Sequence, residues 1–197
     1  GGEAIWFDSK KAGITIPDLF EPLPKESPSE AAIPDIGVVL AADIAELRQS
    51  GHDVIFASIA LRALHDHPEL ASPAVVVGIQ KLITGFHGAP QGRGYFGKER
   101  GWLQGAQVKL TEESDFPPYA DEDAMVEIVI DELIHSAGIR RQGYGGLFHL
   151  INHAAALTEL SRFGYRGLAR QGLDSHHRHL RLYRSLPDVE DELGPLQ

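Results

Sequence analysis

Apolar residues recur in this chain at the spacing of an α-helix, in segments that start after capping residues and stop at glycine or proline. In the segment 147–163, Leu150 and Leu157 fall on one side, while Glu159 and Arg162 fall on the other. Segments with this pattern cover 36–48, 53–66, 73–84, 122–137, 147–163 and 165–185. The pattern predicts an all-α fold, an array or bundle of antiparallel helical hairpins.

Helix starts and breaks refine this expectation. Ser72 followed by Pro73 has the form of an N-cap and a first turn, so we expect a helix there, and we expect Asp121 to cap the helix at 122–137. The valines at 75–77 are also compatible with a buried strand, but the cap and Gln80 favour the helix. In the last segment, Gly172 predicts a break.

Two segments have no helical period. Residues 1–35 contain closely spaced prolines, which predict an extended N-terminal arm or linker. Residues 87–120 are glycine-rich and long for a structureless connection, which predicts a loop or lid, with short strands in it, for instance near 108–110. The expected organisation is thus an arm, a single helical domain at 36–186 and an acidic tail at 187–197.

Composition excludes several classes of function. The 197 residues include 28 acidic and 18 basic side chains, 10 histidines and no cysteine, for a formal net charge of −10. An acidic chain is a poor binder of nucleic acid or of an anionic membrane surface, since both need Lys and Arg. Without cysteine there is no disulfide, thiolate nucleophile or Cys-ligated metal. No run reaches the roughly 20 apolar residues of a membrane span, and no targeting segment is visible, so we expect a cytoplasmic protein.

The most informative histidines are His149 and His153. They are four residues apart, so they project in one direction from the helix, and a metal ion can bridge this spacing. His153 falls at the centre of the apolar side. Two readings stay open here: metal ligands or a general acid–base pair on one hand, and core histidines satisfied by hydrogen bonds on the other.

Other residues are candidates of second rank. His176 lies on the apolar side of the last helix and is a third catalytic candidate. Glu132 and His135 form an E-x-x-H unit, half of the pattern that di-iron bundles need, and no second unit occurs. We therefore expect at most one divalent ion, Zn, Fe or Mn, held by His149, His153, His135 and Glu132. The remaining histidines are expected to be capping or surface groups: His52, His65, His67, His87, His177 and His179.

Substrate contacts are expected from two places. Asn152 and Tyr144 lie close in sequence to the histidine pair and would orient a substrate. Arg93, Tyr95 and Trp102 in the glycine-rich segment would offer anion or aromatic contacts above a pocket. The match of this segment to G-x-G-x-x-G is rejected as a dinucleotide motif, because Gly101 breaks at once any helix that follows it.

Two functions from different classes follow. The first is a small-molecule enzyme with a histidine-lined pocket between helices, as a metal-dependent hydrolase or an oxidoreductase. The second is a non-catalytic helical interaction or oligomerisation module, whose arm docks on a second copy or a partner subunit through Trp6, Phe7 and Phe20.

Overall fold

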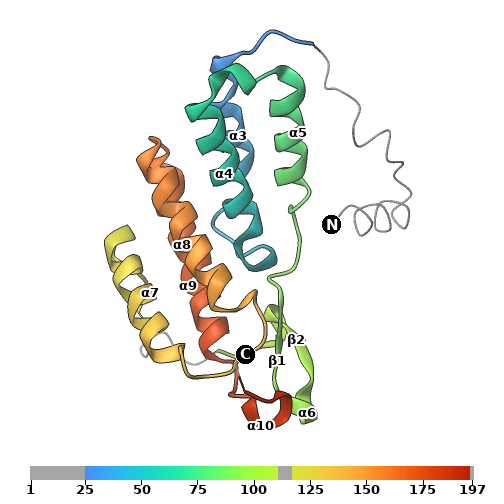
Figure 1. The fold of residues 1–197 in the computed structure, drawn as a ribbon, viewed down its shortest axis with the longest axis vertical. Coiled ribbons are helices and arrows are strands. Elements are labelled where there is room, and N and C mark those ends of the chain that lie inside the picture. Colours follow the sequence, from blue (N-terminus) through green and yellow to red (C-terminus); the bar gives the residue numbers. More distant parts are fainter. Residues whose placement is uncertain (1–24, 111–116, 196–197) are drawn as a thin grey trace, which may run out of the picture.

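The structure is a computed structural model that describes residues 25–110 and 117–195, and most of these residues are helical (Figure 1). The prediction of a helical fold is therefore confirmed. The long helices are α4 (His52–Asp66), α5 (Pro73–Thr84), α7 (Glu122–Ser136), α8 (Gly146–Arg162) and α9 (Arg166–Arg184). Shorter ones are α3 (Pro34–Leu40), α6 (Gly97–Arg100) and α10 (Glu190–Leu193), with 3-10 turns at Glu30–Ala32, Gln49–Gly51, Pro68–Leu70 and Gly105–Gln107.

Helix α8 is the centre of the helical layer. It packs against α4, α7 and α9 (Figure 1). Its predicted apolar side is buried, since Leu150, Leu157 and Leu160 are at most 1% exposed. Helices α4 and α8 lie side by side and run in the same direction (Figure 1). Their N-terminal ends therefore meet at one end of the layer.

The expected N-caps are present. The Ser72 hydroxyl accepts a hydrogen bond from the Val75 amide at 3.4 Å, and the Asp121 carboxylate accepts one from the Ala124 amide at 2.9 Å. Because the cap at Ser72 holds the first turn, the valines at 75–77 belong to α5 and not to a strand.

Helix α9 differs from its prediction because it runs through Gly172 without a break. A Cβ at this position would lie 2.3 Å from Leu157 Cδ2 of α8 and 3.1 Å from Ile44 Cγ1. The glycine is therefore needed for the close approach of α8 to α9, and it does not end the helix.

The first helix and the chain before it also differ from expectation. Helix α3 starts two residues early, at Pro34, and ends at Leu40, after which turns carry Ile44 and Leu47 into the core. Residues 1–24, which hold most of the expected arm with Trp6, Phe7 and Phe20, lie outside the described residues.

The glycine-rich segment contains an antiparallel pair, β1 (Arg93–Tyr95) and β2 (Trp102–Gln104), with Gly94 opposite Leu103. The strand expected near 108–110 does not form; the strands lie earlier in the segment, and residues 111–116 lie outside the described residues.

The C-terminal tail contacts the rest of the fold. Val189 is 2% exposed and its amide donates to the Arg140 carbonyl, while Glu192 of α10 accepts from the Tyr95 hydroxyl at 2.9 Å. Among the residues described, no helix is both long and apolar enough to cross a membrane.

Candidate functional site: a pair of facing histidines

His149 faces His52, and the two imidazoles meet where α4 and α8 begin. Their Nε2 atoms are 3.2 Å apart, and both side chains are half-buried. His149 is one of the predicted site residues. His52 was expected to be a capping group, and its role in this pair is a correction.

Backbone carbonyls determine which nitrogen of each ring carries the proton. His149 Nδ1 lies 2.8 Å from the Gly145 carbonyl oxygen, and His52 Nδ1 hydrogen-bonds the Gln49 carbonyl oxygen. A carbonyl oxygen only accepts hydrogen bonds, so each Nδ1 must be the donor. In neutral imidazoles both Nε2 atoms then carry lone pairs, and the pair brings these two lone pairs together.

Both imidazoles follow left-handed backbone. Before α4, Gln49 and Ser50 have φ of 42° and 60°; before α8, Tyr144 has φ of 48°. Non-glycine residues adopt this region at a cost of about 1–3 kcal/mol each, so the surrounding structure must hold them there. Gly145, with φ of 72°, continues the second run, and a Cβ on it would lie 2.2 Å from His149 Cγ.

Residues 90–95, here called the strap, hold both left-handed runs. The Pro90 carbonyl accepts from the Gln49 amide at 2.9 Å, and the Arg93 carbonyl accepts from the Tyr144 amide at 2.7 Å. The glycine-rich segment, expected to be a loop or lid, thus supports the site through its backbone.

Three fully buried histidines lie beneath the pair, on α8 and α9: His153, His176 and His179. His179 Nε2 donates to the Tyr144 carbonyl at 2.8 Å, and its Nδ1 lies 3.3 Å from His153 Nδ1. His176 Nε2 donates to the Leu150 carbonyl at 3.1 Å, and its Nδ1 accepts from the Tyr119 hydroxyl at 3.0 Å. Both ring nitrogens of His176 and of His179 are therefore satisfied within the protein.

Burial keeps these three imidazoles neutral. It lowers the pKa of His176 to about 3 and that of His179 to about 4, and it holds the pKa of His153 well below its ordinary value. The prediction that His153 and His176 face inward is confirmed. The expectation that His177 and His179 are surface groups is wrong, since both are buried.

The expected metal set is not brought together. Glu132 is fully buried, and its carboxylate binds Arg141 at 3.1 Å, Arg184 and the Ser136 hydroxyl. His135, on the same helix, is exposed. Within residues 25–110 and 117–195, no group of three or more histidine or acidic side chains is placed to hold a metal ion.

Of the two predicted substrate contacts near the pair, one lines a pocket. Asn152 lines a pocket of about 250 Å³ between α4 and α8, together with Ile55, Ser58 and Arg62. Ile55 and Asn152 each follow a histidine of the pair by three residues, so the pocket begins about one helical turn from the pair. Tyr144 is buried, and it serves the site through its carbonyl oxygen.

The other predicted contacts form a separate cluster on the strand pair. The Arg93 guanidinium lies over the Trp102 ring at 5.6 Å, and the Tyr95 ring lies 5.6 Å from that of Trp102. The Tyr95 hydroxyl donates to the Glu192 carboxylate, and this hydrogen bond raises the pKa of Tyr95. The hydrogen bond of Tyr95 to Glu192 joins the strand pair to α10. This cluster is separate from the pair of His52 and His149.

Asp53 was not among the predicted site residues. It follows His52, is 1% exposed, and burial raises the pKa of its carboxyl to about 7, against the lowering effect of the amides of Val54 and Asp53. The dipeptide His52-Asp53 was the available signal, but a dipeptide does not show which way either side chain points.

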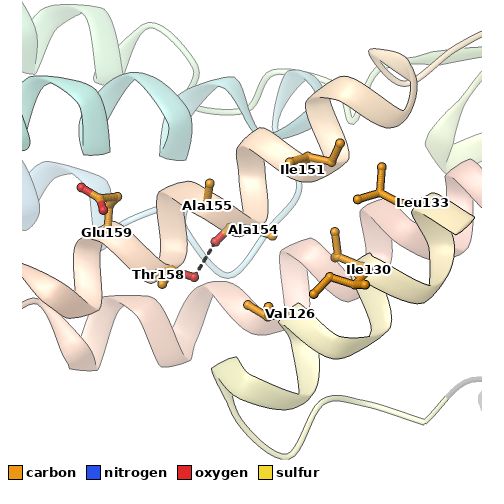
Figure 2. Close-up of a pocket in the computed structure, with 9 residues that line it drawn as sticks. Val126, Ile130, Leu133, Ile151, Ala154, Ala155, Thr158 and Glu159 are labelled. Carbon is orange, nitrogen blue, oxygen red and sulfur yellow. Dashed lines mark hydrogen bonds between the residues drawn. The ribbon is translucent and has the colours of Figure 1, made fainter.

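A second, apolar groove lies on the other side of α8, against α7. It has a volume of about 300 Å³, and Figure 2 shows Val126, Ile130 and Leu133 of α7 on one side and Ile151 and Ala154 of α8 on the other. Glu159 lines both this groove and the pocket between α4 and α8.

Comparisons of this chain with protein-family models, with curated proteins and with solved structures find no match.

Proposed function

We propose that this chain is a small-molecule enzyme, built on an array of antiparallel helical hairpins, in which His52 and His149 are the reactive groups. The observation that carries the proposal is the meeting of two Nε2 atoms at 3.2 Å whose Nδ1 protons are committed to carbonyl oxygens. Two opposed lone pairs repel each other unless a proton or a cation lies near both.

The chemistry available to the pair is general acid–base catalysis. A neutral Nε2 accepts a proton from a water or a ligand hydroxyl, and the facing Nε2 can share that proton. The imidazolium that forms keeps its Nδ1–H bond to the backbone, so the ring does not turn away during the transfer.

The pocket between α4 and α8 is the proposed place for the ligand. Ile55 and Ile59 offer apolar surface, while Asn152, Ser58 and Arg62 offer polar groups. A volume of about 250 Å³ suits a small molecule and not a polymer.

The test uses p-nitrophenyl acetate as a probe with the full chain. We expect ester cleavage faster than that by free imidazole at the same concentration, and we expect His52→Ala and His149→Ala to reduce the rate about 100-fold. His135→Ala is the matched control, since His135 is exposed on α7. Asn152→Ala is expected to raise KM more than it lowers kcat. Wild-type rates in both folded histidine variants would contradict the proposal.

The second candidate, a non-catalytic oligomerisation module with a second copy as partner, has one supporting observation. Ile130 is 51% exposed beside the apolar groove of α7 and α8, and Ile134 is 75% exposed. The ester assay separates the two functions. If the chain is only an oligomerisation module, the wild type and every variant should cleave the ester no faster than free imidazole does.

A further inference from the structure

We infer that His52 and His149 together bind one divalent transition-metal ion, such as Zn²⁺. The inference rests on the proposed function for its choice of site. A bound ion would occupy both Nε2 lone pairs, so proton transfer by the free imidazoles belongs to the metal-free chain, and a water on the ion would supply the base in the metal-bound chain. Imidazole is a common ligand of Zn, Fe, Ni and Cu, and metal-bound histidines usually donate their second ring N–H to a carbonyl or carboxylate. Both histidines here already do so, to Gly145 and Gln49.

The distance between the two nitrogens fits a shared ion. With Zn–N bonds of 2.0–2.1 Å and tetrahedral angles, two ligand nitrogens are roughly 3.3 Å apart. The Nε2 atoms of His52 and His149 are 3.2 Å apart.

The relative orientation of the rings also fits two ligands of one ion. Were the rings end to end, their centroids would be separated by the N···N distance plus one ring radius on either side. The observed centroid distance is only 4.8 Å, with an interplanar angle of 62°, so the pair is bent. Two ligands of one ion likewise approach it at an angle.

The two open positions of the ion favour an oxygen anion. Helix α4 begins at His52 and α8 begins three residues before His149, so the positive ends of two helix dipoles lie beside the pair. An ion held by two neutral imidazoles here keeps its full positive charge, and a hydroxide, carboxylate or phosphate oxygen would offset it. The class of ligand is therefore a small anion that coordinates through oxygen.

The surroundings restrict what else can reach the ion. Phe86 is stacked on His52 at 6.4 Å, Phe56 lies 5.5 Å from His52, and Phe148 lies 6.1 Å from His149, all between ring centroids. These three aromatic rings supply no further ligand, so the remaining ligands of the ion would come from solvent or a small anion.

The experiment is a titration of the EDTA-treated full chain with Co²⁺, followed by its visible absorption, and with Zn²⁺ by calorimetry. We expect one equivalent to bind, and at least a tenfold weaker Kd in His149→Ala and in His52→Ala. His135→Ala should bind as the wild type does. Because His52 also holds the turn at Gln49, circular dichroism of each variant accompanies the titration, and His149→Ala is the decisive variant.

Two outcomes overturn the inference: no saturable binding by the wild type, or unchanged binding in folded His149→Ala. The ester assay, run with and without EDTA, separates this failure from that of the proposed function. Histidine-dependent cleavage by a chain that shows no saturable metal binding would refute the metal site and leave the enzyme standing. Stoichiometric metal without any cleavage would refute the enzyme and leave the metal site standing.

Discussion

His153, His176 and His179 are chemically the same side chain as His52 and His149, yet their surroundings give them a different role. Each of the three is completely buried, and the carbonyls of Leu150 and Tyr144 accept from two of them. Through Tyr144 this buried cluster supports the left-handed turn before α8. The buried imidazoles thus make their hydrogen bonds inside the protein, while the rings of the pair above them are partly exposed.

The buried cluster makes stability depend on pH. The folded-state pKa values are about 3 for His176 and about 4 for His179, below the value of about 6.5 in an unfolded chain. Between about pH 6.5 and 4 the unfolded chain binds protons that the folded chain does not, so acidification lowers the free energy of unfolding. Each such histidine contributes about 1.4 kcal/mol per pH unit. Denaturant unfolding at a series of pH values measures this slope.

Asp53 acts in the opposite direction over the same range. Its folded pKa of about 7 exceeds its ordinary 3.8, so the folded chain binds one extra proton there and the slope is reduced. The control is His179→Gln, which keeps a donor for the Tyr144 carbonyl and removes one titrating group. Its slope is expected to be smaller by up to about 1.4 kcal/mol per pH unit. A wild-type stability that stays constant from pH 6.5 to 4.5 would refute the neutral cluster.

At the scale of elements, contacts between helices decided features that local patterns left open. The pattern of α8 was predicted within one residue at each end, because its apolar side and its glycines are local signals. The break predicted at Gly172 is wrong, because a side chain at this position would overlap Leu157 of the neighbouring helix α8. A glycine at a close helix contact and a glycine at a break are identical in sequence.

Two glycines of α9 form a matched test of this contact. Gly172→Ala is expected to destabilise the protein by about 1–3 kcal/mol, because its Cβ would overlap Leu157 although alanine favours a helix. Gly167→Ala meets no atom within 4 Å and is expected to stabilise by up to about 1 kcal/mol. Thermal or denaturant unfolding measures both. Equal effects of the two substitutions would show that α8 does not press on Gly172.

At the scale of the whole molecule, one buried carboxylate joins distant parts of the chain. Glu132 of α7 binds Arg141 in the connection to α8 and Arg184 at the end of α9. Its E-x-x-H spacing with His135 suggested metal binding, but the two side chains of this motif point to different environments. Two arginines near one carboxylate make it an ion-pair centre that fixes α7 against the rest of the fold.

Removing the charge of Glu132 tests this role. Glu132→Gln leaves two partly buried guanidinium groups without their carboxylate and is expected to cost about 3 kcal/mol of unfolding free energy. Glu127→Gln on the same helix is the control; Glu127 is exposed, and its substitution should change stability by less than about 0.5 kcal/mol. If the two variants have the same free energy of unfolding, the ion pairs of Glu132 do not fix α7 against the rest of the fold.

The sequence by itself determined the helical class, the caps at Ser72 and Asp121 and the inward direction of His153 and His176. Each of these depends on residues within a few turns of one helix, so periodicity and capping chemistry suffice. Only the tertiary structure decided that His149 meets His52, 97 positions away, and that Glu132 meets two arginines. A helical wheel gives the direction of a side chain from its own axis, but packing decides which element lies in that direction. The candidate site depends on the contact of α4 with α8 and on two left-handed turns held by the strap, and none of these is a local property.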